Sequence, residues 1–357
     1  MGLLDTAVMG REMRRYMKMI IGLLGGLALF LYGMNMMSEN LQKAAGERMK
    51  HVLAIMTSNP LMGVLAGVLT SAVLQSSGAI TVMVIGFVGA GLMTLPQAIS
   101  VIMGANVGTT ITAQLLAFQL SDYIWGIVFL GFVIYFFAEK EQGRYIGQAI
   151  LGFGILFIGI DAMENAMRPL ASGPIFAHLI EKVSDVPVLG LVMGTLMTLV
   201  VQSSSATIAV LQNLASQTGA DGVTSIIGLA GAIPIMLGDN IGTTITALLA
   251  SIGQSTNAKR TAAAHSVLNV SGSLLFLWVV PWFAEFITWI SPKGPESEVI
   301  SRQIANAHTI FNVLSTILWL PFIWFMVRIV TWMVPGGKSG TEDTVLDSDG
   351  SHQRHRI

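Results

Sequence analysis

Long apolar runs separated by short polar breaks fill most of the chain. A helix needs roughly 20 apolar residues to cross a bilayer, and runs of about 10 to 14 are typical of buried or re-entrant pieces. Several runs are too short for a full crossing, so the pattern predicts an all-α polytopic membrane protein with both full spans and shorter helices. The runs cover residues 19–37, 61–74, 78–95, 98–105, 107–118, 123–138, 146–160, 187–201, 223–237, 262–284 and 308–334.

The composition supports a membrane protein and excludes other classes. Of the 357 residues, 53% are hydrophobic and 11% are charged, whereas soluble proteins carry about 25% charged residues. The net charge of −1 argues against a nucleic acid partner, because binding a polyphosphate requires clustered Lys and Arg. The absence of cysteine excludes disulfides and thiol catalysis. Basic residues between Arg11 and Lys18 precede the first apolar run, which predicts a retained first helix with residues 1–18 on the cytoplasmic side.

The chain contains an internal duplication. The segment "NPLMGVLAGVLTSAVLQSSGA" at 59–79 aligns with "VPVLGLVMGTLMTLVVQSSSA" at 186–206. Further along, "GANVGTTITAQLLA" at 104–117 aligns with "GDNIGTTITALLAS" at 238–251. The second copy has a longer connector at 216–223, which explains the change in offset. Secondary transporters are commonly built from two such repeats that meet near the bilayer midplane.

Each repeat carries a Gln-Ser-Ser cluster inside an apolar stretch, at 75–77 and at 202–205. Non-helical backbone within a membrane is tolerated only where protein or a water-lined cavity satisfies it. We therefore expect each cluster at the tip of a helical hairpin inside the protein. The free N–H groups of the following helix, together with hydroxyl and amide donors, are typical of a site for a tetrahedral oxyanion. Neither cluster has a Lys or Arg within ten residues, so the balancing positive charge must come from elsewhere.

The second repeated motif, "GANVGTT" and "GDNIGTT", supplies hard oxygen donors. Unwound backbone carbonyls, Asn side chains and Thr hydroxyls at this depth are expected to form a cage for an alkali cation. Asp239 is the one carboxylate in these motifs, and it aligns with Ala105 of the first repeat. The two halves are therefore not equivalent. An ionisable side chain within the membrane is a candidate for function.

Other interpretations of the polar residues remain open. Ser and Thr also join membrane helices through small-residue packing. The segments "AAHSVLNV" and "NAHTIFNV" place His265 with Asn269 and His308 with Asn312 on one helix face, which we interpret as interhelical hydrogen-bonding pairs, with pH sensing as the alternative. An intramembrane enzyme with a Ser nucleophile and a His base is a further alternative, but the chain has no nucleophile-elbow pattern.

The paired "QSSG" and "QSSS" elements, each followed by "GxNxGTT", and the later "AHxxxN" helices resemble the type II sodium/phosphate cotransporter family in its bacterial branch. The resemblance implies two inverted repeats with re-entrant helical hairpins and discontinuous transmembrane helices in the bacterial inner membrane. It implies uptake of inorganic phosphate with co-transported sodium ions by alternating access, without a prosthetic group or an enzymatic reaction. For phosphate, it assigns Gln75, Ser76, Ser77, Gln202, Ser203, Ser204 and Ser205. For sodium, it assigns Asn106, Thr109, Thr110, Asp239, Asn240, Thr243 and Thr244.

The expected organisation follows from the repeat and the resemblance. Short interfacial helices are expected at 41–57 and 174–185, and membrane lipid surrounds the protein. Another oxyanion as substrate, phosphate export and proton coupling remain alternatives, and the sequence leaves the oligomeric state open. The predicted segments are a cytoplasmic N-terminal segment at 1–18, transport repeats at 19–138 and 139–284, an additional C-terminal membrane helix at 285–334, and a disordered polar tail at 335–357.

Overall fold

The computed structural model describes residues 2–55, 59–118, 120–171, 186–219 and 221–336. Within these ranges the chain is helical and forms no β-strand beyond one isolated bridge between Thr218 and Ser225, which confirms the all-α prediction. The α-helices are α1 (Gly2–Ile55), α2 (Pro60–Leu74), α3 (Ser77–Gly89), α4 (Leu95–Leu116), α5 (Ile124–Phe137), α6 (Glu141–Ala171), α8 (Pro187–Val201), α9 (Ser204–Ala215), α10 (Gly228–Ala250), α11 (Thr256–Leu277), α12 (Val280–Ile290), α13 (Glu296–Trp319) and α14 (Ile323–Met333).

Five helical stretches in the described part of the chain are long and apolar enough to cross a membrane. A sixth results if α11 and α12, which meet at a 90° bend, form one broken span. Large apolar side chains also cover the outside, and Val200, Trp278 and Trp332 are each more than 80% exposed. Such a surface is unfavourable in water but suits contact with lipid. The protein is therefore a multi-pass membrane protein. The five stretches are Met17–Leu53, Leu95–Leu116, Glu141–Ala166, Gly228–Ala250 and Glu296–Met333.

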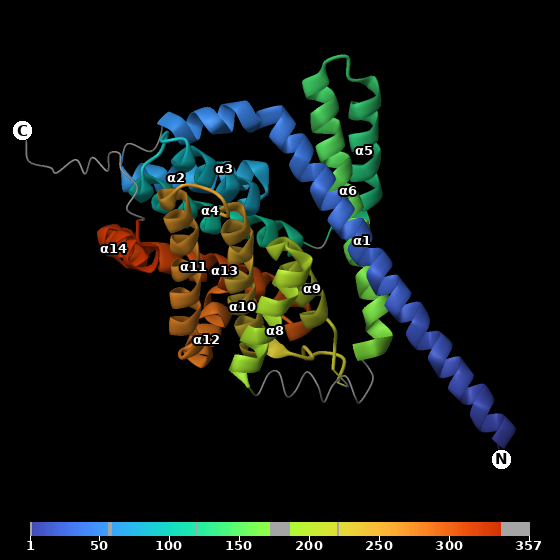
Figure 1. The fold of residues 1–357 in the computed structure, drawn as a ribbon. Helices are drawn as coiled ribbons and strands as arrows, with labels where there is room; N and C mark the ends of the chain where they lie inside the picture. Colours follow the sequence, from blue (N-terminus) through green and yellow to red (C-terminus); the bar gives the residue numbers. More distant parts are fainter. Residues whose placement is uncertain (1, 56–58, 119, 172–185, 220, 337–357) are drawn as a thin grey trace, which may run out of the picture.

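The N-terminal region forms one helix rather than two. We expected a membrane helix at 19–37 followed by a separate interfacial helix at 41–57, but α1 is continuous from Gly2 to Ile55. Its C-terminal part changes direction and passes over α2 and α3 (Figure 1). Favourable helix formers such as "LQKAAGERMK" fill this part, so nothing local ends the helix. The other expected interfacial helix, at 174–185, lies outside the described residues.

Glycines bring α2 against α4 and α8 against α10. A Cβ atom added at Gly67 would collide with the Val101 carbonyl oxygen, and one added at Gly194 would collide with that of Ile235. Small residues spaced four apart allow the backbones of membrane helices to approach this closely. The same spacing occurs on all four helices, at Gly63 and Gly67, Gly104 and Gly108, Gly190 and Gly194, and Gly238 and Gly242.

The "GANVGTT" and "GDNIGTT" segments do not unwind, which corrects the sequence-based expectation. They lie inside the continuous helices α4 and α10. The Thr109 hydroxyl donates to the Ala105 carbonyl oxygen, and the Thr243 hydroxyl donates to that of Asp239, each at 2.9 Å. The motif glycines serve close packing, and the backbone carbonyls here are engaged in helical hydrogen bonds. Any cation ligands in these motifs are therefore side-chain oxygens.

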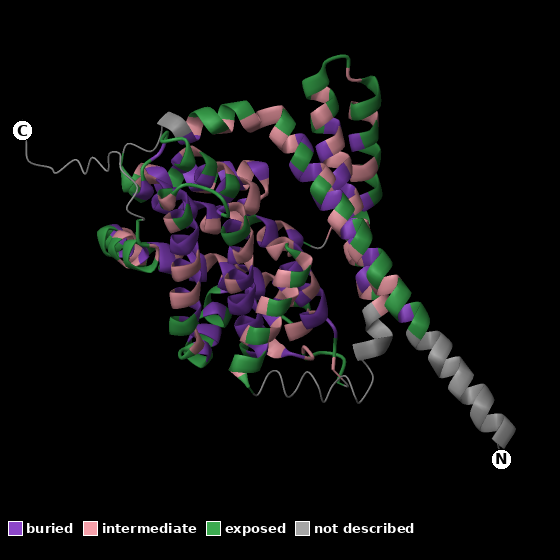
Figure 2. Cartoon of the chain, in the orientation of Figure 1, coloured by how far each residue is buried: buried purple, intermediate pink, exposed green. Residues whose placement is uncertain are grey.

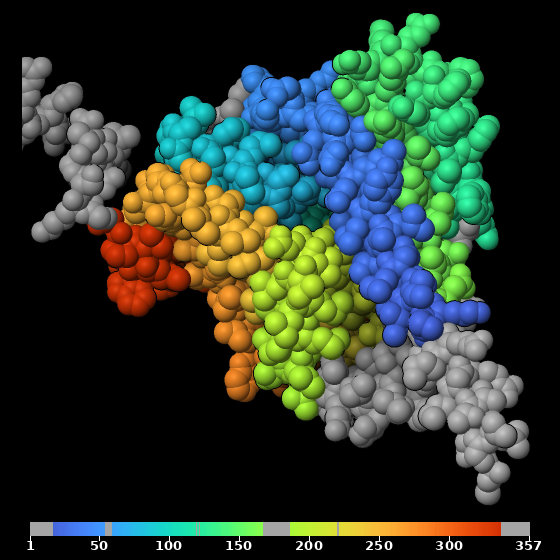
Figure 3. Space-filling model, turned by 45° about the vertical axis from the view of Figure 1, so that its right-hand side comes forward, coloured from blue at the N-terminus to red at the C-terminus, as the bar shows by residue number. Residues whose placement is uncertain are grey.

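The packed centre of the molecule positions the two Gln-Ser-Ser elements. Buried residues concentrate where α4, α9, α10, α11 and α13 meet, whereas α14 and the α5–α6 pair are exposed over much of their surface (Figure 2). Helix α1 packs along α6 and lies beside the α5–α6 pair (Figure 3), and α6 also contacts α9 directly. The predicted boundary at residue 284 falls within α12, and residues 337–357 of the predicted tail lie outside the described ranges.

Candidate functional site

The two Gln-Ser-Ser elements form the same local structure. Gln75 follows the last residue of α2 as its C-cap, and Gln202 follows α8 in the same way, both in the left-handed conformation with φ 53° and ψ 29°. Among the described residues these are the only non-glycine positions with positive φ. The next residues, Ser76 and Ser203, cap the following helices by accepting a hydrogen bond from a backbone N–H three residues ahead. Each apolar run is thus interrupted by a two-residue turn.

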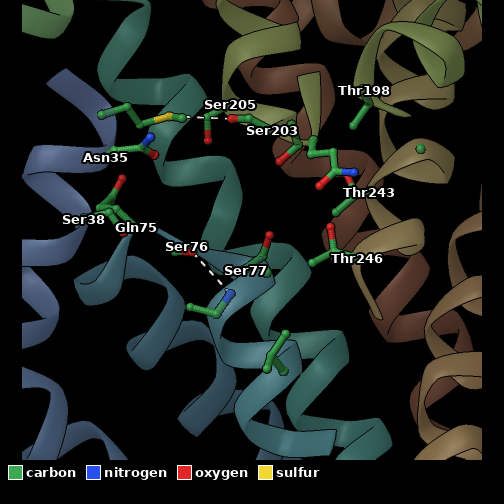
Figure 4. A pocket seen from close by; sticks show the side chains of 17 residues that line it. Asn35, Ser38, Gln75, Ser76, Ser77, Thr198, Ser203, Ser205, Thr243 and Thr246 are labelled. Carbon is green, nitrogen blue, oxygen red and sulfur yellow. Dashed lines mark hydrogen bonds between the residues drawn. The ribbon is translucent and has the colours of Figure 1, made fainter. Parts of the chain in front are cut away.

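Both turns line a single cavity of about 310 Å³. Since a water molecule occupies about 30 Å³ of liquid, the cavity has room for a tetrahedral oxyanion with several waters. Serines from the two turns face each other across it (Figure 4). All seven residues that the resemblance assigned to phosphate belong to its wall, namely Gln75, Ser76, Ser77, Gln202, Ser203, Ser204 and Ser205.

Helix α1 completes the wall, which the sequence reasoning missed. Asn35 and Ser38 face the turns from α1 (Figure 4). The Ser38 hydroxyl donates to the Leu74 carbonyl oxygen at 3.0 Å, just before the first turn. The available signal was the pair of polar residues within the apolar run "LFLYGMNMMS".

The cavity is polar but carries no formal charge on the described side chains that line it. Helices α3 and α9 both begin there, and the first N–H groups of a helix have no intrahelical partner. Their dipoles place partial positive charge at the same end. The electrostatic environment therefore favours an anion, although the charge of that anion is not cancelled by any residue of the wall.

A second, much smaller cavity of about 10 Å³ lies against the first. Ser77, Ser204 and Thr243 line both cavities. This volume is close to the minimum for one water molecule, so it also suits one desolvated alkali cation. Apart from one His, the polar groups around it are hydroxyls and side-chain amides, from Ser77, Asn106, Thr109, Ser204, Asn240, Thr243, Asn269 and His308.

The residues assigned to sodium are only partly brought together. Asn106, Thr109, Asn240 and Thr243 line the small cavity, whereas Thr110 and Thr244 line neither cavity. The Thr110 hydroxyl donates to Val107 at 2.7 Å, and the Thr244 hydroxyl donates to Ile241 at 2.8 Å, both within their own helices. Thr110 also accepts a hydrogen bond of 3.1 Å from Thr309 on α13, which is the helix-joining role given as the alternative for these residues.

Asp239 lies behind the wall of the larger cavity. Its side chain is fully buried, and its Oδ1 accepts a hydrogen bond of 2.7 Å from Thr198, which lines that cavity. Its Oδ2 has no partner among the described residues. A buried carboxylate bonded through one oxygen is costly unless a cation or a proton neutralises it.

The two "AHxxxN" helices contact the "GxNxGTT" helices through asparagines. Asn106 donates to Asn269 at 3.1 Å, and Asn312 donates to Asn240 at 3.4 Å. The predicted interhelical hydrogen bonds of the two asparagines are therefore confirmed. Those of the histidines are not observed, because both ring nitrogens of His265 and Nδ1 of His308 have no partner among the described residues. Asn269 is an additional potential oxygen ligand that the sequence reasoning did not assign to the site.

No group of three or more His, Cys, Asp or Glu side chains in the described residues could hold a metal ion. Neither His ring is hydrogen-bonded to a described serine, as a base activating a nucleophile would be. The geometry offers donors for an anion and neutral oxygens for an alkali cation.

Comparison with known proteins identifies the family. A family model described as Na+/Pi-cotransporter matches residues 29–165 and again residues 162–285. The chain belongs to this family. A second match by the same model in the second half is consistent with the duplication in the sequence. No solved structure matches the chain.

Several relatives carry related names. The chain is 33% identical to "Uncharacterized protein YqeW" of Bacillus subtilis over 77% of its own length and 87% of that protein. It is 24% identical to "Putative inorganic phosphate export protein YjbB" of Escherichia coli K12 over 79% of its own length but only half of YjbB. A segment of 106 residues, 29% of this chain and 15% of the relative, is 37% identical to the human "Sodium-dependent phosphate transport protein 2B". Membership in this family suggests phosphate transport.

Proposed function

We propose that this protein is a sodium-coupled transporter of inorganic phosphate, and that the cavity between the two Gln-Ser-Ser turns binds the phosphate. The observation that carries the proposal is the shared cavity: residues of both turns, far apart in the sequence, line one polar space at the starts of α3 and α9. Serine hydroxyls, glutamine amides and unpaired helix N–H groups match the acceptor oxygens of a tetrahedral oxyanion.

Sodium provides the charge that the wall lacks. The small cavity presents hydroxyl and amide oxygens, which are the ligands a hard cation prefers. Ser77 and Ser204 line both cavities, so a cation there would lie beside the bound phosphate. Asp239 is a second candidate for pairing with a cation because of its unsatisfied oxygen. Thr110 and Thr244 are not included in this proposal.

The mechanism we propose is alternating access by two inverted repeats, residues 19–138 and 139–284. The matching turn dihedrals at Gln75 and Gln202 support equivalent roles for α2–α3 and α8–α9 as re-entrant hairpins. In this scheme residues 1–18 are cytoplasmic and residues 285–334 form an additional membrane segment. Relative movement of the hairpin units would open the shared cavity to one side at a time.

Uptake against the membrane potential requires co-transported cations, and the oxygen-lined small cavity favours sodium in this role. Moving one charge across 100 mV changes its free energy by about 2.3 kcal/mol. Bringing a divalent phosphate into a cell that is negative inside therefore costs about twice that electrical energy. Two sodium ions cancel the charge, and a third lets the potential assist. Export is the second candidate, because a relative is named as an export protein. In that case the same cavity would release phosphate outward.

Reconstitution into proteoliposomes tests the function. We expect labelled phosphate to accumulate when external sodium is present, and at least tenfold less when choline replaces it. In the same assay Ser204→Ala should reduce phosphate uptake at least tenfold, because it removes a hydroxyl from both cavities. Vesicles preloaded with phosphate measure efflux and distinguish export from uptake.

Ser273 provides the matched control. Its hydroxyl is buried and donates to the Leu237 carbonyl oxygen at 2.9 Å, which is a packing role. Ser273→Ala should retain most of the uptake, with a cost in stability of about 1 kcal/mol. Equal uptake by the two variants would refute the proposed phosphate site, and uptake that is the same in choline would refute the sodium coupling.

A further inference from the structure

Helices α1 and α6 pack against each other as counterparts in the internal duplication. The repeat alignment pairs Gly33 with Gly159, and the same register pairs Phe30 with Leu156. A Cβ atom added at Gly33 would collide with the Leu156 backbone nitrogen, and one added at Gly159 would collide with that of Phe30. Exchanging the two repeats therefore exchanges these two contacts. The helices run antiparallel about an approximate two-fold axis, which is the arrangement that inverted repeats produce.

The same register relates two cavities. Residues of α1 and α3 line the cavity between the turns, and their counterparts on α6 and α9 line a second cavity of about 260 Å³, which we name the α6–α9 cavity. Counterpart cavities of inverted repeats face opposite sides of the membrane, because the axis lies in the membrane plane. Three pairs carry this relation, with the residue of the first cavity given first: Asn35 with Asp161, Ser38 with Glu164, and Val82 with Ala209.

Only one of these two cavities reaches the proposed phosphate site. Both Gln-Ser-Ser turns line the cavity between the turns, whereas no residue of either turn lines the α6–α9 cavity. Val82 is 44% exposed, but its counterpart Ala209 is only 2% exposed. The two repeats therefore have similar sequences and adopt different conformations around their turns.

A hydrogen-bonded pair closes the first turn next to the α6–α9 cavity. Thr112 on α4 is 3% exposed and donates to Gln75 Oε1 at 2.7 Å. The Nε2 of Gln75 donates to the Ala72 carbonyl oxygen, which fixes the orientation of the amide. One helical turn after Thr112, Leu116 lines the α6–α9 cavity. The pair of Gln75 and Thr112 therefore ties the first turn to α4 beside that cavity.

The counterpart pair in the second repeat is open. Thr246 on α10 aligns with Thr112, and Gln202 aligns with Gln75. Both Thr246 and Gln202 line the cavity between the turns, and Figure 4 shows the Thr246 side chain at its wall. Neither side chain forms a hydrogen bond with a described residue. The closed pair thus borders the cavity that does not reach the turns, and the open pair lines the cavity that does.

We propose that the α6–α9 cavity is the second access route to the turns, and that it opens when the Gln75–Thr112 pair opens and the Gln202–Thr246 pair closes. The inference rests on the proposed alternating access and names its gating residues. Because both pairs consist of Gln and Thr, exchanging them conserves the kind of hydrogen bond that is made. Two states with equivalent contacts have similar free energies, so a small bias shifts their populations. In the exchanged state Val82 is covered and Ala209 faces the open route.

Two single-cysteine reporters follow the exchange, because the chain contains no cysteine. In detergent, without phosphate or sodium, we expect Val82→Cys to react with a water-soluble methanethiosulfonate at least tenfold faster than Ala209→Cys. Thr112→Val removes the hydroxyl that holds Gln75, so the exchanged state gains population. It should slow the reaction of Val82→Cys and accelerate that of Ala209→Cys, each at least threefold. General loosening of the fold would instead accelerate both reactions.

Thr246→Val should act in the opposite sense. It removes the hydroxyl that stabilises the exchanged state, so Ala209→Cys should react at least threefold more slowly. Combining Thr112→Val with Thr246→Val should return both rates to within twofold of the reporters alone, and Thr112→Ser, which keeps a hydroxyl, should leave both rates unchanged. The matched control is Thr110→Val, which removes a buried hydroxyl of α4 that lines neither cavity and should leave the ratio of the two rates unchanged.

Parallel or absent changes at the two reporters in Thr112→Val, or no compensation by Thr246→Val, would overturn the inference. Because phosphate and sodium are absent, the reporter rates do not depend on which substrate is carried. Parallel reporter changes together with lost phosphate uptake in Ser204→Ala would support the phosphate site and reject this route. Opposite reporter changes without sodium-dependent phosphate uptake would support the route and reject the proposed substrate.

Discussion

Gln75 and Gln202 adopt a backbone conformation that most residues avoid. Left-handed φ and ψ angles cost an L-residue roughly 1 kcal/mol or more, and glycine adopts them freely. Glycine would therefore be the favourable residue at these helix ends if only the fold mattered. Both glutamines line the cavity between the two turns. The Gln75 side chain accepts a hydrogen bond of 2.7 Å from Thr112 on α4 and donates to the Ala72 carbonyl oxygen, so it also holds the turn. We infer that backbone strain is accepted at Gln202 because its side chain contacts the substrate.

Gln202→Gly separates these two effects. The substitution should leave stability unchanged or raise it by up to about 1 kcal/mol, since relief of strain is offset by the flexibility of glycine in the unfolded chain. It should also weaken phosphate affinity, as measured by the half-saturating phosphate concentration in the uptake assay. The control is Gln148→Gly inside α6, which should lose about 1 kcal/mol without a change in phosphate affinity. A destabilised Gln202→Gly with normal affinity would contradict the inference.

Asp221 in the loop between α9 and α10 gives a pH prediction outside the membrane-spanning helices. Its carboxylate accepts hydrogen bonds from the Thr224 hydroxyl at 2.7 Å and from the backbone N–H groups of Val223 and Thr224 at 3.0 Å. These bonds lower the pKa of Asp221 from 3.8 to about 2, with the Thr224 hydroxyl as the largest cause. Because the pKa is lower in the folded state than in the unfolded state, the ionised carboxylate stabilises the folded loop at pH values above the unfolded pKa. This contribution is lost as the pH falls through about 2. Carbon-13 NMR of the labelled carboxyl should show its midpoint near pH 2, and a midpoint near 4 would contradict the hydrogen-bonded turn.

At the scale of helices, close packing of α2 on α4 depends on Gly67. A methyl group there would collide with the Val101 backbone, which cannot move without shifting α4. We expect Gly67→Ala to destabilise the protein by about 1 to 3 kcal/mol and to lower the thermal unfolding temperature in detergent. Gly86 on α3 is the matched control because nothing lies within 4 Å of an added Cβ. Gly86→Ala should be neutral or stabilising by up to about 1 kcal/mol, and equal effects of the two changes would contradict this packing.

The sequence predicted that the two turns meet, but it did not predict that the neighbouring "GxNxGTT" motifs stay helical. A polar cluster repeated inside an apolar run has few explanations, so Ser76 and Ser203 could be assigned to one site. Glycine and threonine in "GxNxGTT" have two possible explanations: the helix unwinds to bind an ion, or it packs closely against a neighbouring helix. Only the observed contact with α2 or α8 decides between these explanations. That contact also explains why Thr110 and Thr244 lie away from the cavities. The contribution of α1 through Asn35 required knowledge of which distant helix covers the turns.

For the whole molecule, the main consequence is that two halves of the chain build one site. Ser77 begins α3 and Ser204 begins α9, yet both line the small cavity of about 10 Å³. A space of that size brings its lining groups within reach of a single ion. Two thiols at these positions should therefore coordinate one soft metal ion together, which single thiols cannot do.

The variant carrying Ser77→Cys and Ser204→Cys tests this arrangement in a chain that has no other thiol. We expect Cd2+ to bind at one ion per chain, because thiolates are the ligands that soft metals prefer. Binding to the folded state alone should stabilise it by about 2.7 kcal/mol at a concentration one hundred times the dissociation constant, which a thermal unfolding assay detects. Each single variant should show at least tenfold weaker binding, and so should the pair of Ser77→Cys with Ser271→Cys, because Ser271 is a partly buried residue of α11 that lines neither cavity. If the thiols lie in the transport site, phosphate with sodium should compete with Cd2+. If the double variant binds Cd2+ no more tightly than the single variants, the two halves do not meet at these serines.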